Sequence, residues 1–123
     1  LLVLWSSALL SAFLGNIPVV IAMVPLVNSL IGSTQLEVAA DAEVLNTFVA
    51  APLWWSLALG ACFGGNGTLY GAAANVVVSQ IAKRNGYQIA FWEFLRFSVP
   101  VTLITLVMAS GYIYLCYFFF SPL

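Results

Sequence analysis

Charged residues are scarce in this chain of 123 residues, and their scarcity excludes a soluble globular domain. Only 6% of the residues are charged, against roughly 25% in soluble domains, and 63% are hydrophobic. The net charge of −1 provides no basic surface for nucleic acid. The stretches 1–36, 44–82 and 97–123 carry no charge, and each exceeds the roughly 20 apolar residues that cross a bilayer. We expect an integral membrane protein whose partner is the lipid bilayer.

Histidine is absent and cysteine is rare, which removes most catalytic and metal chemistry. The two cysteines, Cys62 and Cys116, form neither a disulfide framework nor a zinc site. No nucleophile–base pair is recognisable. We therefore predict no enzyme, no catalytic residue, no metal site and no cofactor, apart from Na⁺ or H⁺ as a coupling ion.

The C-terminal part predicts one membrane span. Residues 97–123 are rich in Val, Leu, Ile and Phe, with tyrosines towards the end, which is typical of a terminal transmembrane helix with an aromatic belt. Residues 83–96 are expected to form a loop and a short interfacial helix. Glu93 and Arg96, three residues apart, are spaced to pair on that helix.

The stretch 52–82 is too long for one ordinary span. Its 31 residues would measure about 46 Å as a continuous helix, whereas a bilayer core is about 30 Å thick. The run Gly64-Gly65-Asn66-Gly67-Thr68 is the densest set of helix breakers in the chain. We predict a broken transmembrane helix, with half-helices at 52–63 and 69–82 and an unwound loop at 64–68.

The N-terminal part shows a second interruption. The run Gly15-Asn16-Ile17-Pro18 predicts a re-entrant hairpin over 1–32 with its tip at 15–18. Asn is favoured as the N-terminal cap of a helix and Pro is favoured in its first turn, so a second helix is expected to start here. A single kinked span over 5–31 is the alternative. The segment 33–51 holds Glu37, Asp41 and Glu43 and is expected to be an acidic loop.

The positive charges predict the orientation in the membrane. Lys83, Arg84 and Arg96 lie on one side of the predicted spans, and the positive-inside rule makes that side cytoplasmic. The 33–51 loop and the C-terminus are then extracytoplasmic.

Interrupted helices at membrane depth point to a transport site. Unwound backbone is tolerated there only where it lines a cavity or packs in protein, and half-helix ends attract ions. The candidate substrate or ion ligands are Gly15, Asn16, Ile17, Pro18, Gly64, Gly65, Asn66, Gly67, Thr68 and Asn75. The alternative is close helix packing, since Gly60, Gly64, Gly67 and Gly71 also form small-xxx-small patterns.

Three runs resemble the ArsB/NhaD-type permeases of the ion transporter superfamily, which includes citrate carriers; the nearest subgroup is the P protein-like permeases. They are the run 54–78, with LALGACFGGNGTLYGAAANVVV, the run 11–18, SAFLGNIP, and the run 91–102, with FWEFLR and PVT. The resemblance implies the C-terminal inverted repeat of a transporter, in which a hairpin and a broken helix face the substrate. Members of the family move arsenite, sodium against protons, or carboxylates.

One position departs from the family pattern. Gly15 stands where the family usually has an Asp, so this part of the protein has no obvious intramembrane carboxylate. The chain begins at Leu1 without Met, and we expect a piece of a longer protein. The other repeat would come from the same protein or from a partner chain, and the complete permease is expected to be a homodimer.

The predicted function is secondary active transport of a small inorganic ion or organic anion by alternating access. The alternative is a non-transporting membrane subunit, derived from a permease half, that serves assembly of a larger complex. The predicted architecture is an all-α integral membrane fold, with a re-entrant hairpin, a broken transmembrane helix, an interfacial helix and a final transmembrane helix.

Overall fold

The computed structural model describes residues 1–38 and 42–119, and every regular element in that part of the chain is helical. The elements are α1 (Leu2–Leu14), α2 (Asn16–Val38), α3 (Ala42–Leu45), the π-helical η1 (Asn46–Ala50), α4 (Ala51–Gly65), α5 (Ala73–Arg84), α6 (Phe91–Tyr114) and the π-helical η2 (Leu115–Phe119). Three helical stretches are long and apolar enough to cross a membrane: Asn16–Gln35, Glu43–Gly65 and Phe91–Phe119. The chain is therefore an all-α integral membrane protein, as predicted.

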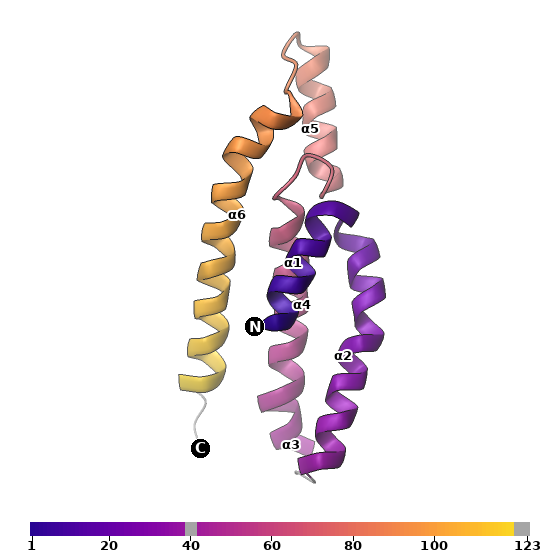
Figure 1. Cartoon of the computed structure of the whole chain (residues 1–123), viewed down its shortest axis with the longest axis vertical. Helices are drawn as coiled ribbons and strands as arrows, with labels where there is room; N and C mark the ends of the chain where they lie inside the picture. The colour runs from indigo at the N-terminus through magenta and orange to yellow at the C-terminus, as the bar shows by residue number, and fades with distance from the viewer. Residues whose placement is uncertain (39–41, 120–123) are drawn as a thin grey trace.

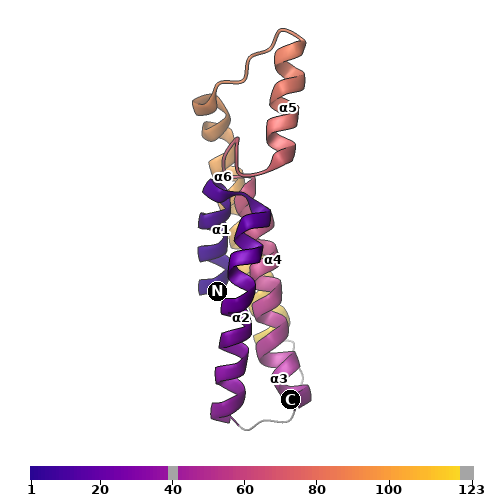
Figure 2. The same ribbon diagram turned by 90° about the vertical axis from the view of Figure 1, so that its right-hand side faces the viewer.

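The first two helices form a hairpin. The chain reverses direction at Gly15, so that α1 and α2 run side by side in opposite directions (Figures 1 and 2). Val3 of α1 packs with Val19, Met23 and Val27 of α2 in one buried cluster. The alternative of a single kinked span over 5–31 is wrong, because a kinked span would continue in one direction.

The remaining helices run along the hairpin. α4 and α5 follow one another along the long axis with an unwound segment between them, and α6 returns beside them (Figure 1). The hairpin tip lies at the level of that unwound segment, which we call the break (residues 66–72). α1 lies between α2 and α6, since its Leu4 and Ala8 pack with Leu106 and Ala109 of α6.

α1 and α4 pack with their backbones close together. A Cβ atom added at Gly60 would lie 2.3 Å from the Leu4 carbonyl oxygen, and one at Gly64 would lie 2.2 Å from the Ala8 carbonyl oxygen. Only glycine permits this approach, which is the usual role of small residues at membrane helix contacts. The packing alternative therefore holds for Gly60 and Gly64, and we call this contact the glycine seam.

The predicted loop over 33–51 is wrong in most of its length. α2 continues through Gly32 to Val38, and residues 42–50 are helical and lead into α4. A single glycine inside a helix costs only about 1 kcal/mol, and residues 33–38 contain no proline to end the helix. Residues 39–41, including Asp41, lie outside the described part.

The break lies later in the chain than predicted. α4 continues to Gly65 and α5 begins at Ala73, so residues 66–72 are unwound instead of 64–68, and the half-helices are not 52–63 and 69–82. Gly64 and Gly65 stay helical because they are buried, and Gly64 packs against α1. Tertiary packing here outweighs the low helix propensity of glycine.

The predicted helix within 83–96 is not a separate element; its residues 91–96 form the first turns of α6. α5 continues to Arg84, residues 87–90 form no helix, and α6 runs from Phe91 past Pro100 without interruption. An internal proline removes one backbone hydrogen bond, and the rest of this long helix persists. Residues 120–123 of the predicted terminal span lie outside the described part.

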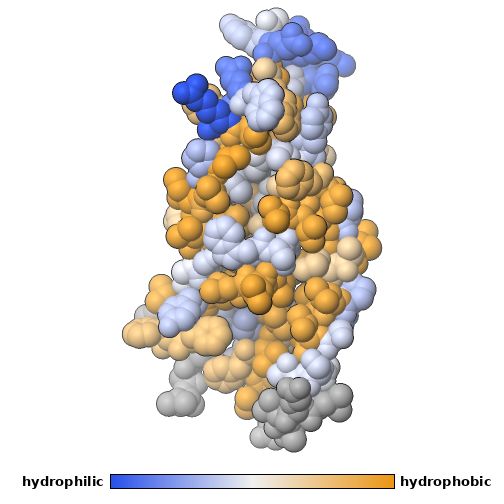
Figure 3. Space-filling model, in the orientation of Figure 1, coloured by the Kyte–Doolittle hydropathy of each residue, from blue (hydrophilic) through white to orange (hydrophobic). Residues whose placement is uncertain are grey.

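Hydrophilic residues gather at one end of the molecule. Figure 3 shows them over the end of α5 and the start of α6, with hydrophobic residues covering most of the surface below. α5 has no buried residue within the described chain and stands apart from the other helices (Figure 2). The polar end carries Lys83 and Arg84, the last residues of α5.

Candidate functional site

The hairpin tip contacts the break. At Gly15 the backbone has φ 89° and ψ 161°, a region open essentially to glycine alone. A Cβ added at Gly15 would lie 3.6 Å from the Gly71 carbonyl oxygen, so the tip reaches the far end of the break. The sequence runs that predicted two interruptions thus come together in space.

The Thr68 hydroxyl fastens the break to α1. It donates a hydrogen bond to the Ala12 carbonyl oxygen and accepts one from the Gly71 amide at 3.0 Å. Thr68 is half-buried, and both partners are backbone groups. Its hydroxyl therefore serves the geometry of the break itself.

The Asn16 side chain fastens the tip from the other side. With its Nδ2 turned towards the neighbouring oxygens, it donates to Ser11 Oγ at 2.8 Å, to the Ala61 carbonyl at 3.0 Å and to the Gly71 carbonyl at 3.2 Å. This orientation leaves the single Ser11 hydroxyl proton for the Ala61 carbonyl at 2.6 Å. A polar group from each of α1, α2, α4 and the break is satisfied at this junction.

Two further side chains hold carbonyl groups of the break. Asn75 Nδ2 donates to the Gly65 and Thr68 carbonyl oxygens at 3.3 and 3.0 Å. Ser98 Oγ of α6 donates to the Gly67 carbonyl oxygen at 2.9 Å. These bonds replace the helical hydrogen bonds that the unwound segment lacks, which is a requirement for irregular backbone at membrane depth.

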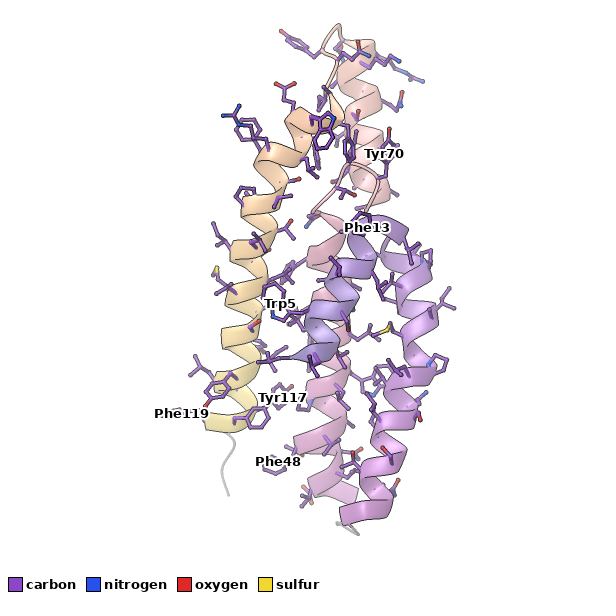
Figure 4. All side chains as sticks on the ribbon, viewed as in Figure 1. Trp5, Phe13, Phe48, Tyr70, Tyr117 and Phe119 are labelled. Atoms are coloured by element: carbon purple, nitrogen blue, oxygen red, sulfur yellow. The ribbon has the colours of Figure 1, made fainter. Side chains whose placement is uncertain are left out.

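Aromatic side chains border the break. The rings of Tyr70 and Phe91 stack with centroids 6.0 Å apart and link the break to the start of α6. Figure 4 shows Tyr70 and, at the hairpin end, Phe13 near the break, whereas Phe48 and Phe119 lie towards the opposite end. The break is thus supported from α1, α2, α5 and α6.

The helix ends give the break an electrical polarity. α4 ends at Gly65 with its carbonyl groups towards the break, and α5 begins at Ala73 with its amides towards it. Ala72, the residue preceding α5, has no side chain that caps these amides. The carbonyl end favours a cation and the amide end favours an anion.

A cavity of about 640 Å³ opens beside the break. Its walls come from the break, α5, the 87–89 connector and α6. Asn66, which is exposed, and Asn75 line it, together with Glu93, Ser98 and Thr102 of α6. Glu93 and Arg96 form no ion pair within the described chain. Arg96 lines a different pocket on the surface.

The predicted site residues therefore separate into groups. Gly15, Asn16, Gly65, Gly67, Thr68 and Asn75 gather where tip and break meet, whereas Asn66 lines the cavity. Gly64 is part of the glycine seam, and Ile17 and Pro18 are exposed at the start of α2.

The sequence pattern did not predict three polar residues at the junction and the cavity. Ser11 is fully buried at the junction, and Ser98 and Thr102 line the cavity from α6; Thr102 also lines a second, apolar pocket shared with α1. The available signal was a spacing of four residues between Ser98 and Thr102, which places two hydroxyls on one face of an apolar helix.

The free thiols and the acidic residues form no metal centre in the described residues. Cys62 and Cys116 are free and exposed. No group of three His, Cys, Asp or Glu side chains that could hold a metal ion occurs there.

Comparison with known proteins assigns the family. A family described as "Putative citrate transport" matches residues 1–115. The chain belongs to this family. It is 43% identical over 120 residues to a 46 kDa membrane protein of Mycobacterium leprae, which covers 98% of this chain and 26% of that protein. No solved structure matches.

One further relative is named as a transporter, and another is longer than the Mycobacterium leprae protein. The chain is 43% identical over 117 residues to a Mycobacterium bovis protein named as an uncharacterized transporter, covering 95% of the chain and 25% of the relative. It is 41% identical over 112 residues to the P protein of Mus musculus, covering 91% of the chain and 12% of the relative. The chain spans about a quarter or less of these relatives.

Proposed function

We propose that this chain supplies half of the substrate site of a secondary active transporter that moves a small inorganic ion or organic anion by alternating access. The site lies between the hairpin tip and the break and includes the adjoining cavity, which Asn66 and Asn75 line. The observation that carries the proposal is the junction itself, where Asn16 and Thr68 join segments distant in sequence around unwound, glycine-lined backbone.

Family membership supports a transport role, and the chemistry of the break supports a small charged cargo. The amide end of α5 and the carbonyl end of α4 offer opposite partial charges at one place. Such a pair suits an anion together with a coupling cation, Na⁺ or H⁺. The site is completed by a second repeat, in the same protein or in a partner chain, and the whole assembles as a homodimer.

The charge distribution supports an orientation. Lys83 and Arg84 lie at the end of α5, and Arg96 lies near the start of α6, at the same polar end of the molecule (Figure 3). The proposal puts this end in the cytoplasm and the C-terminus outside.

The test uses the intact protein reconstituted in liposomes. We expect Asn66→Ala to lower uptake at least tenfold without loss of folded protein, because the Asn66 side chain is exposed in the cavity and makes no hydrogen bond within the described residues, whereas its backbone bonds are kept by alanine. Asn85→Ala is the matched control: it removes an exposed asparagine side chain at a helix end whose hydrogen bond goes to the Ile81 carbonyl.

Equal uptake by the Asn66 variant and wild type would refute the site. Absence of any solute flux from the intact protein, together with stable association in a larger complex, would refute transport and favour the assembly subunit.

A further inference from the structure

The cavity beside the break is lined by one charged side chain and several neutral oxygen atoms. Glu93 is the charged residue among those that line it. No residue of α1 or α2 among those described contributes to its wall, so it is separate from the tip contacts of Asn16. A cavity whose charge comes from a carboxylate favours cations over anions.

Two of the neutral groups have oxygen lone pairs left for a ligand. Asn75 uses its Nδ2 on the Gly65 and Thr68 carbonyls, which leaves its Oδ1 as an acceptor. Ser98 donates its proton to the Gly67 carbonyl, so its oxygen also remains an acceptor. Both hydrogen bonds fix these side chains at the edge of the cavity.

Thr102 supplies the second and independent observation. The residue is 8% exposed, and its Oγ1 is buried without a hydrogen-bond partner. Several helical hydroxyls in this chain bond to a carbonyl one turn earlier, as Thr34 does to Leu30 at 2.9 Å and Ser110 does to Leu106 at 2.8 Å. The Thr102 hydroxyl makes no such bond, although an unpartnered buried hydroxyl is unfavourable.

The positions along α6 assign different roles to Glu93 and Thr102. They are nine residues apart, about 13 Å along a helix, so one ion does not contact both. Glu93 is exposed near the charged end, whereas Ser98 and Thr102 lie one turn apart and further along the helix. Divalent sites use several carboxylates, so a single remote one suits a monovalent ion.

We propose that this cavity binds a monovalent cation, with Na⁺ as the probe. Glu93 attracts the ion at the mouth, and the oxygens of Asn75, Ser98 and Thr102 hold it at the inner end. This deepens the proposed transport function and rests on it, since it gives the coupling ion a location; binding itself is measurable without transport.

The experiment measures thermal unfolding of the intact protein in detergent, in NaCl and in choline chloride at equal ionic strength. Na⁺ binding to the folded state raises the melting temperature of the wild type. Thr102→Val keeps the shape of the side chain and removes the hydroxyl that has no hydrogen-bond partner. We therefore expect it to be at least as stable as wild type in choline, yet to lose the Na⁺-dependent shift.

Thr105→Val is the matched control. Thr105 lies on the same helix, donates to the Thr102 carbonyl at 2.9 Å and lines a different pocket with Leu59 and Phe63. This variant keeps the Na⁺-dependent shift. A Thr102 variant that keeps the same shift as Thr105→Val, or a wild type that shows no shift, overturns the proposal.

Glu93→Gln tests the mouth. Loss of one attractive charge is expected to weaken Na⁺ affinity about tenfold at low ionic strength, with a smaller effect at high salt. Glu43→Gln, at the opposite end of the molecule, leaves the affinity unchanged. If uptake still depends on Asn66 but no Na⁺ shift occurs, the cation site fails and the transport proposal stands.

Discussion

The Thr68 hydroxyl donates a hydrogen bond to the carbonyl oxygen of Ala12, 56 residues earlier in the chain. This bond joins the break to the helix that carries the hairpin tip. The same hydroxyl accepts the Gly71 amide, so one side chain fixes both the position and the internal shape of the break. The geometry of the break therefore depends on a side chain whose hydrogen-bond partners are both backbone groups.

We predict that Thr68→Val destabilises the protein by about 1–3 kcal/mol, because it leaves the Ala12 carbonyl and the Gly71 amide without their partner. Chemical or thermal unfolding in detergent measures the loss. Thr34→Val is the control, since Thr34 is an exposed-surface hydroxyl bonded only to Leu30. Equal stability of the two variants would contradict the assigned role.

We predict that Gly64→Ala loses about 1–3 kcal/mol of stability, because the added methyl group would lie 2.2 Å from the Ala8 carbonyl and force α1 away from α4. Gly111→Ala lies in α6 with nothing within 4 Å of the added atom and is expected to stabilise slightly, by up to about 1 kcal/mol. The melting temperatures of the two variants measure this difference in stability. A stable Gly64→Ala protein would mean that the seam is looser than described.

Gly15→Ala and Gly86→Ala separate backbone strain from function. Both glycines have positive φ, 89° and 87°, and neither added methyl would meet an atom closer than 3.6 Å. We expect each variant to lose about 1–3 kcal/mol of stability through the backbone alone. Only Gly15→Ala should also reduce uptake in liposomes, and equal uptake by both variants would remove the tip from the site.

Single cysteines test the orientation. In a protein whose Cys62 and Cys116 have been replaced by Ser, we expect Asn85→Cys to react with a membrane-impermeant thiol reagent from the cytoplasmic side only. Val44→Cys, exposed at the opposite end, should react from the outside only. Labelling in the opposite sense would invert the proposed topology.

The local helix signals of this sequence predict the fold class and the existence of both interruptions, because glycine, asparagine and proline act through their own backbone preferences. The bounds of the break depend on distant contacts instead. Gly64 and Gly65 stay helical through burial, and Gly64 does so against Ala8. No local pattern contains that contact.

The sequence predicts the residues of the candidate site as ligands of a substrate or ion. In the structure, several of them instead form hydrogen bonds with the backbone. Thr68 donates a hydrogen bond to the backbone of α1 and Asn75 donates one to the backbone of the break, whereas Thr102 has the buried hydroxyl without a partner. Residue type alone does not reveal which polar group is already satisfied, because the partners are carbonyls brought near by folding.

The glycine seam restricts where this molecule can bend. Backbones this close along Gly60 and Gly64 do not slide past one another without repacking, so we expect α1 and α4 to move as one body. The hairpin tip and the start of the break then move together. α5, which has no buried residue within the described chain, is joined to that body through residues 66–72. A hinge in this segment would change the width of the cavity while leaving the seam intact.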